Sequence, residues 1–188
     1  MKTVDELVAL SDSCESGLNI VRICTYTASE LKALANCLVK LTPDSRVVEI
    51  GTFAGRSASL LFQLQKDLNL DIHLIDNCMW HPEASGAAFN KMIATHFPGI
   101  PFDFHRMTSQ SLGQSWNHAI NFLHVDGHHD LEFVWADCEM WLPHVVSGGM
   151  VAFHDSDDAG VKKALDHFVT PTWEHLETVE RVTTWRKP

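Results

Sequence analysis

The stretch VEIGTFAGRSASL, residues 48–60, joins a short apolar run to small residues that are typical of the start of a helix. The run contains Glu49, and Gly51 and Gly55 follow it. Glycine allows a tight turn and a close approach of backbone N–H groups to a ligand, and the start of a helix attracts an anionic group. Glu49 favours a ligand that also carries an amine. The stretch predicts a strand, a ligand-binding turn and a helix, although a turn without a ligand would show the same glycines.

Four further apolar runs repeat this pattern, because each ends in polar residues and precedes a helical stretch. They are DIHLIDN (71–77), PFDFHRM (101–107), INFLHVDG (120–127) and GGMVAFHDS (148–156). The alternation predicts an α/β fold with a doubly wound, mostly parallel sheet and helices on both faces. Residues 172–188 predict two closing strands, as an antiparallel hairpin at the sheet edge, which brings the sheet to seven strands. Ligands of such sheets bind at the carboxyl ends of the strands.

The domain boundary is placed from a helix start near residue 27. Thr27 and Glu30 form the pattern of a capping box, and leucines at helical spacing follow up to Leu41. They predict a helix over about 28–41. We expect residues 28–188 to form a single domain, and residues 1–27 to be an N-terminal extension that could act as a lid over the site.

Composition excludes several classes of protein. The chain has 188 residues, of which 45% are hydrophobic, and its formal net charge is -10. A nucleic-acid surface needs clustered Lys and Arg, and a membrane span needs roughly 20 apolar residues in a row. Five scattered cysteines without a CxxC pair indicate reduced thiols. We expect a cytoplasmic protein that binds neither nucleic acid nor membrane. The composition is compatible with a homo-oligomer and does not decide the oligomeric state.

The spacing of the glycines bears on the kind of ligand. A dinucleotide site favours GxGxxG, whereas this turn reads GTFAG and lacks the close second glycine, which disfavours an NAD-dependent oxidoreductase. Asp76 ends the next apolar run, about 20 residues after the first glycine, where a carboxylate can accept hydrogen bonds from both ribose hydroxyls. A nucleoside with an amino-acid tail would satisfy both features.

Several of these segments resemble the class I S-adenosylmethionine-dependent methyltransferases. VVEIGTFAGRSA resembles their first motif, HLIDN the ribose-binding second and RMTSQ the adenine-contacting turn, and residues 122–156 are similar to their fourth and fifth strands. Among them the chain resembles the metal-dependent small-molecule O-methyltransferases, in particular the subgroup of macrocin-type and cephalosporin-hydroxylase-like proteins. The resemblance spans about residues 46–155 and implies a Rossmann-like methyltransferase fold, S-adenosyl-L-methionine as cofactor and a small hydroxylated methyl acceptor.

The resemblance also implies which residues bind the cofactor. Glu49, Gly51 and Ser57 would hold the methionine part, Asp76 the ribose, and Ser109 with Gln110 the adenine. Met107 stands where the family often has glycine and would pack near the adenine. The remaining candidates are Thr52, Phe53, Gly55, Asn77 and Asp126.

A dense group of polar residues follows the fourth and fifth runs. HVDGHHD and FHDSD supply Asp126, His128, His129, His154, Asp155 and Ser156. Carboxylates with imidazole and hydroxyl oxygen suit a divalent metal, Mg or Mn if oxygens dominate, and Fe or Zn if two imidazoles join. The resemblance places Asp126 and Asp155 at metal-carboxylate positions, with His154 or Ser156 at a third position where the family uses Asp or Asn. Such a metal would lower the pKa of a bound substrate hydroxyl.

Methyl transfer needs an activated nucleophile, because the sulfonium leaves as a neutral thioether. A base with a pKa near 7 is useful, and His128 or His129 is the candidate. Resemblance to sugar methyltransferases favours His128, and resemblance to the catechol type favours His129. A non-catalytic S-adenosylmethionine-binding module stays open as another function. A metal-dependent phosphohydrolase is disfavoured, because HHD and HD both end predicted strands, whereas the usual His-Asp scaffold of such enzymes is helical.

Overall fold

The computed structural model describes residues 2–16, 26–79 and 82–188. Its centre is one seven-stranded sheet in the order β3-β2-β1-β4-β5-β7-β6. The strands are β1 (Arg46–Ile50), β2 (Asp71–Ile75), β3 (Asp103–His105), β4 (Ile120–Val125), β5 (Val145–Phe153), β6 (Glu174–Val179) and β7 (Val182–Arg186). β1 to β5 pair in parallel, and β7 pairs antiparallel with both β5 and β6. The predicted doubly wound sheet and its closing hairpin are confirmed.

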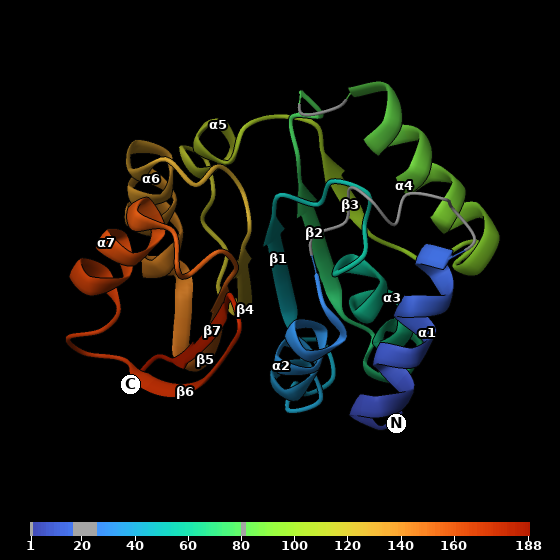
Figure 1. The fold of residues 1–188 in the computed structure, drawn as a ribbon, viewed down its shortest axis with the longest axis horizontal. Helices are drawn as coiled ribbons and strands as arrows, with labels where there is room; N and C mark the ends of the chain where they lie inside the picture. Colours follow the sequence, from blue (N-terminus) through green and yellow to red (C-terminus); the bar gives the residue numbers. More distant parts are fainter. Residues whose placement is uncertain (1, 17–25, 80–81) are drawn as a thin grey trace.

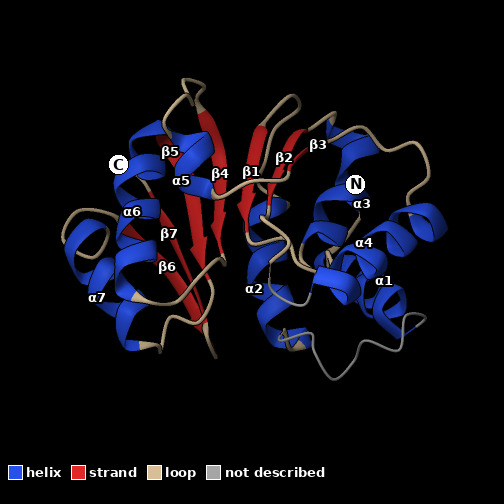
Figure 2. Cartoon of the chain, turned by 90° about the horizontal axis from the view of Figure 1, so that it is seen from above, coloured by secondary structure: helices blue, strands red, loops and turns tan. Residues whose placement is uncertain are grey.

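Helices cover both faces of this sheet, which gives three layers (Figures 1 and 2). One layer contains α1 (Val4–Ser16), α2 (Ala28–Leu38), α3 (Ala58–Leu68) and α4 (Pro82–His96). The other contains α5 (Ser109–Gly113), α6 (Leu131–Trp141), the 3-10 turn η1 (Leu142–His144) and α7 (Ala159–Phe168). Because parallel strands are joined by crossover connections, a helix layer lies on each face of the sheet.

Each sheet face has its own apolar core. Successive side chains of a strand point to opposite faces, so Val47 packs with the α1–α4 layer while Val48 packs with the α5–α7 layer. Phe122 and Leu123 of β4 divide in the same way. This double burial explains why the strands read as continuous apolar runs.

The start of α2 agrees with the sequence prediction, and its end does not. Thr27 Oγ1 accepts from Glu30 N at 3.1 Å, and Glu30 Oε2 accepts from Thr27 N at 2.7 Å, so the capping box is present. The helix ends at Leu38 rather than Leu41. The N–H groups of Lys40 and Leu41 bond only three residues back, to the carbonyl oxygens of Cys37 and Leu38, because the chain tightens before the turn to β1.

The described part of the N-terminal extension belongs to a helix layer. α1 packs against α2, α3 and α4, with Leu7 fully buried. Ser11 Oγ donates to the Arg56 carbonyl oxygen at 3.1 Å, which ties α1 to the start of α3. The lid expected over residues 1–27 concerns in addition residue 1 and residues 17–25, which lie outside the described residues.

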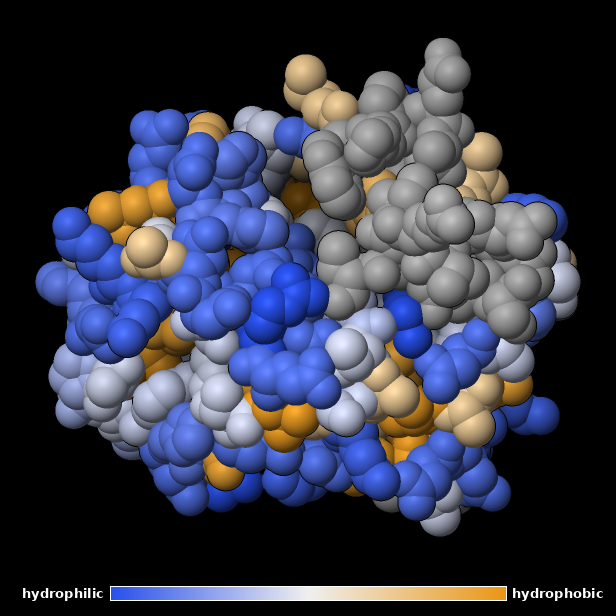
Figure 3. Space-filling view, viewed as in Figure 1, coloured by the Kyte–Doolittle hydropathy of each residue, from blue (hydrophilic) through white to orange (hydrophobic). Residues whose placement is uncertain are grey.

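The surface seen in the view of Figure 1 is mostly hydrophilic. Apolar side chains of the described residues lie there in small separate areas (Figure 3). No helix in the described ranges combines the length and the apolar character that crossing a bilayer requires.

Candidate functional site

A cavity of about 760 Å³ opens where the strands β1, β2, β4 and β5 end. It brings together all of the predicted cofactor residues except Glu49, and both candidate bases line it as well. They are Gly51, Thr52, Phe53, Gly55, Ser57, Asp76, Asn77, Met107, Ser109, Gln110, Asp126, His128 and His129. Tyr26, Asp137, Asp155 and Asp158 also line the cavity. The carboxyl edge of the sheet is therefore hollow at the place where the sequence predicts a ligand.

The turn after β1 depends on glycine for a physical reason. Gly51 has φ +90°, and a Cβ atom there would lie 1.8 Å from the carbonyl oxygen of Asp126, which follows β4. Any side chain at residue 51 would therefore push β1 and β4 apart. Phe53 has φ +47°, a backbone conformation that residues other than glycine seldom adopt.

Asp76 holds this turn in place. Its Oδ2 accepts from Phe53 N at 2.7 Å, and its Oδ1 accepts from Cys78 N at 2.6 Å. A carboxylate oxygen has two acceptor sites, so each oxygen retains one for a further donor. The side chain thus joins the end of β2 to the glycine turn and still presents acceptors to the cavity.

The cavity is also lined by a carboxyl group that the sequence did not reveal, that of Asp137. Asp137 Oδ1, on α6, accepts from Ser109 Oγ at 2.5 Å and from Gln110 Nε2 at 2.9 Å. Burial raises the pKa of Asp137 to about 7, and the hydrogen bond from Ser109 offsets this only in part. The available signal was an acidic residue beside Cys138 on the apolar side of the predicted helix.

Glu49, a predicted cofactor residue, lies beneath the cavity and is not among the residues that line it. It is 1% exposed, and its Oε1 lies 3.0 Å from His124 Nδ1. His124 Nε2 lies 2.9 Å from Tyr26 OH, which donates to Asp126 Oδ2 at 2.7 Å. Glu49 is thus connected to Tyr26 in the cavity wall through one intervening side chain, that of His124. Tyr26 was missed because it precedes the first recognisable motif.

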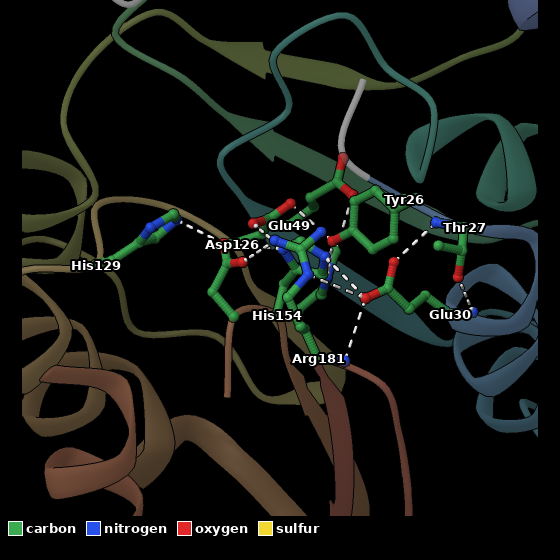
Figure 4. A network of polar contacts seen from close by, with 10 residues as sticks. Tyr26, Thr27, Glu30, Glu49, Asp126, His129, His154 and Arg181 are labelled. Carbon is green, nitrogen blue, oxygen red and sulfur yellow. Dashed lines mark hydrogen bonds and ion pairs between the residues drawn. The ribbon is translucent and has the colours of Figure 1, made fainter. Parts of the chain in front are cut away.

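His154 lies among three carboxylates (Figure 4). Its Nδ1 is 3.2 Å from Asp126 Oδ1 and 3.0 Å from Asp155 Oδ2, and its Nε2 is 3.7 Å from Glu30 Oε1. Burial by itself would lower the pKa of His154, but the hydrogen bonds to Asp126 and Asp155 outweigh it and raise the pKa to about 10. His154 is therefore an imidazolium at neutral pH.

Arg181, in the turn between β6 and β7, reaches the same group of carboxylates. Its Nη1 donates to Asp155 Oδ1 at 2.6 Å, and its backbone N donates to Glu30 Oε1 at 3.2 Å. Burial acts to raise the pKa of Asp155, but hydrogen bonds from His129 and His154 lower it well below its usual range. Asp155 is therefore ionised and paired.

The two candidate bases differ in how they are held. His129 Nε2 lies 2.7 Å from Asp155 Oδ2, and this hydrogen bond raises the pKa of His129 against the opposing effect of burial. Gly160 of α7 packs closely on this loop, because a Cβ there would lie 2.2 Å from the His129 carbonyl oxygen. His128 has a side chain that is 58% exposed, and its Nδ1 accepts from Asp130 N at 3.1 Å.

Asp126, His154 and Asp155, the predicted metal ligands, lie close enough to share one ion, since one ligand atom from each lies within 4.8 Å of the others. Their present partners do not suit one. The His154 nitrogen that faces both carboxylates is a proton donor, and a guanidinium occupies one oxygen of Asp155. Ser156, the alternative third ligand, does not line the cavity and bonds through its backbone N to the Arg181 carbonyl oxygen. The donor set is thus already saturated by groups of the chain.

Known proteins share this fold. The O-methyltransferase NovP superposes with a TM-score of 0.74 at 14% identity, covering 98% of this chain and 97% of NovP. The methyltransferase PaMTH1 of Podospora anserina, solved with SAH bound, gives 0.69 at 13% identity, covering 100% and 89%. CalS11, a TDP-rhamnose 3'-O-methyltransferase, gives 0.61 at 13% identity, covering 97% and 93%.

Sequence comparison gives one curated relative and one family. An uncharacterized protein of Sinorhizobium fredii (strain NBRC 101917 / NGR234), y4gI, is 26% identical over 127 residues, or 64% of this chain. The matched segment spans only 14% of that relative's length. The model of the methyltransferase-domain family Methyltransf_24 matches residues 48–156, more than half of the chain. These residues carry the glycine turn, Asp76 and the carboxylates of the cavity, and the chain belongs to the Methyltransf_24 family, among the class I S-adenosylmethionine-dependent methyltransferases.

Proposed function

We propose that the chain transfers a methyl group from S-adenosylmethionine to an oxygen of a small hydroxylated acceptor. The observation that carries this proposal is the arrangement of one cavity. Nucleoside-binding features line it near β1, β2 and α5, and a histidine held by a buried carboxylate lines it near β5. Cofactor groups and a base for the acceptor would thus share one space.

The cofactor would be held by residues of three strand ends. The backbone N–H groups of the glycine turn and the start of α3 suit the methionine carboxylate. Asp76 keeps acceptors for the ribose hydroxyls. Ser109 and Gln110 both bond to Oδ1 of Asp137 and hold the carboxyl in place, so Oδ2 would accept from the adenine amino group. When bound, S-adenosylmethionine supplies an electrophilic methyl group on a sulfonium.

The base we favour is His129. Its Nε2–H donates to Asp155, so the lone pair on Nδ1 is the one available to take a proton. The acceptor oxygen would lose its proton to Nδ1 as its bond to the methyl carbon forms and the carbon–sulfur bond breaks. His128 is exposed, and its Nδ1 accepts a hydrogen bond from Asp130 N. The Asp130 carboxylate lies 3.7 Å from that nitrogen, which is beyond hydrogen-bond distance.

The class of acceptor is proposed from charge and from the fold. A net charge of -10 disfavours a polyanionic acceptor such as RNA. CalS11 is a TDP-rhamnose 3'-O-methyltransferase, which makes hydroxylated sugars a sensible first set of acceptors to test. A divalent metal could assist at Asp126 and Asp155, but the saturation of these carboxylates argues against it.

Calorimetric titration with S-adenosylmethionine, its demethylated product and NAD tests the cofactor. We expect the first two to bind and NAD not to bind; the reverse order would revive an oxidoreductase. Turnover is then measured as demethylated cofactor released with a panel of hydroxylated small molecules. Binding without turnover on any acceptor would favour the non-catalytic binding module.

The base is tested with His129→Asn and the matched variant His128→Asn. We expect His129→Asn to lower kcat by about 10²-fold or more, with the affinity for S-adenosylmethionine unchanged. His128→Asn should keep most of the activity. A larger loss in His128→Asn would assign the base to His128.

A further inference from the structure

The carboxylates of Asp126 and Asp155 lie on the side of the cavity where we propose that the acceptor binds. Each of their oxygens has a partner within the protein. Asp126 Oδ2 accepts from Tyr26 OH, and Asp126 Oδ1 lies 3.2 Å from His154 Nδ1. Asp155 Oδ1 accepts from Arg181, and Asp155 Oδ2 lies 2.7 Å from His129 Nε2. A carboxylate that binds a divalent ion needs at least one oxygen facing the ion rather than a protein donor.

His154 takes the central position in this group (Figure 4). The single Nδ1–H proton lies between Asp126 Oδ1 and Asp155 Oδ2, so the two carboxylates share it. An ion that bridged the same two oxygens would have to lie where this proton lies. The His154 side chain is completely buried, and its Nε2 lies 3.7 Å from Oε1 of Glu30, which is buried as well.

The positive charges come from distant parts of the chain. Arg181 belongs to the C-terminal hairpin, and its backbone and side chain contact Glu30 of α2 as well as Asp155. The Arg181 guanidinium and the His154 ring N–H thus face three buried or half-buried carboxylates. Removing either donor would leave a largely buried carboxylate oxygen without its partner.

We infer that this chain occupies the carboxylates of Asp126 and Asp155 with its own donors, the His154 ring N–H and the Arg181 guanidinium, in the place where the family pattern implies a divalent metal. The inference rests on the proposed function only in that the same carboxylates orient His129. Asp155, held from one side by Arg181, presents its other oxygen to His129. The site is therefore organised before any ion is added.

Binding of Mn²⁺ to the wild-type protein, followed by electron paramagnetic resonance and calorimetry, tests this directly. We expect no stoichiometric Mn²⁺ site, and no change in S-adenosylmethionine affinity when Mn²⁺ is exchanged for EDTA. Turnover should be equal in EDTA and in Mn²⁺. One Mn²⁺ per chain in the wild type, lost in Asp126→Asn, would overturn the inference.

A gain of metal binding is the complementary test. His154→Asp removes the central donor and adds a carboxylate, so we expect it to bind Mn²⁺ at least about tenfold more tightly than the wild type and to melt at a higher temperature in its presence. Arg186→Met is the control. Arg186 lies on the same hairpin as Arg181, and among the contacts described it pairs only with exposed Glu174. Equal Mn²⁺ affinity in the wild type and a folded His154→Asp would count against the inference.

These outcomes are separate from those of the proposed function. Failure to bind S-adenosylmethionine refutes the function but leaves the Mn²⁺ result interpretable. A wild-type Mn²⁺ site refutes the inference but leaves methyl transfer intact. The wild-type measurement also decides the question if His154→Asp does not fold.

Discussion

Replacement of Asp137 by Asn should raise the stability of the protein in a way that depends on pH. Asp137 is 2% exposed, and burial raises the pKa of its carboxyl to about 7 from an ordinary value of 3.8. At 1.36 kcal/mol per pKa unit, this difference corresponds to about 4 kcal/mol, which is an upper estimate of the cost of the ionised form. The amide of Asn is neutral at every pH and keeps an oxygen for Ser109 and Gln110.

The sign follows from proton binding. Between pH 4 and pH 7 the unfolded chain has released the Asp137 proton while the folded chain still holds it. The free energy of unfolding of the wild type therefore falls as pH rises through this range and is constant with respect to this group above pH 7. Relative to Asn, the wild type should be equal near pH 4 and less stable by up to about 4 kcal/mol near pH 8.

Urea denaturation followed by circular dichroism at three pH values across this range provides the measurement. Glu139→Gln is the matched control, because Glu139 lies on the same helix and is exposed. Its stability difference from the wild type should show little dependence on pH. A difference between Asp137→Asn and the wild type that is the same at all three pH values would refute the reasoning, because desolvation of a carboxylate cannot act on the protonated form.

Three further predictions concern other parts of the structure. Gly51→Ala should destabilise the protein by more than about 3 kcal/mol or prevent folding, whereas Gly86→Ala, where a Cβ meets nothing within 4 Å in α4, should stabilise it by about 1 kcal/mol in thermal melting. Tyr26→Phe should cost about 1–3 kcal/mol in urea denaturation, because buried His124 and partly buried Asp126 each lose a hydrogen bond; an unchanged midpoint would contradict the network. Burial raises the pKa of Cys37 to about 11, so peptide mapping after iodoacetamide treatment at pH 8 should find half-buried Cys78 alkylated before Cys37.

The parts of the fold that could be predicted are those with local causes. The capping box at Thr27 involves residues three apart, and the continuous apolar runs of β1 and β4 follow from burial on both sheet faces. The glycine turn also leaves a local signal, since Gly51 and Gly55 both have positive φ. Such features leave a signal within a few positions of the sequence.

The parts of the site that could not be predicted join distant segments. Tyr26 and Asp126 are 100 residues apart, and Arg181 reaches Asp155 only because the C-terminal hairpin joins the sheet beside β5. Asp137 reads as one acidic position in a helix until α5 is packed against α6. Contacts of this kind have no periodicity or spacing that a single sequence reveals.

The position of β7 has a consequence for synthesis of the protein. β7 lies between β5 and β6 although it follows both in the chain, so a ribosome makes both neighbours before the strand that joins them. Until residues 182–186 emerge, β5 has an open edge with unpaired backbone groups, which is a template for association with other chains. The same hairpin delivers Arg181 to Asp155. Nascent chains stalled before β7 are therefore expected to combine an adhesive strand edge with uncompensated carboxylates, and to depend on chaperones until the sheet is complete.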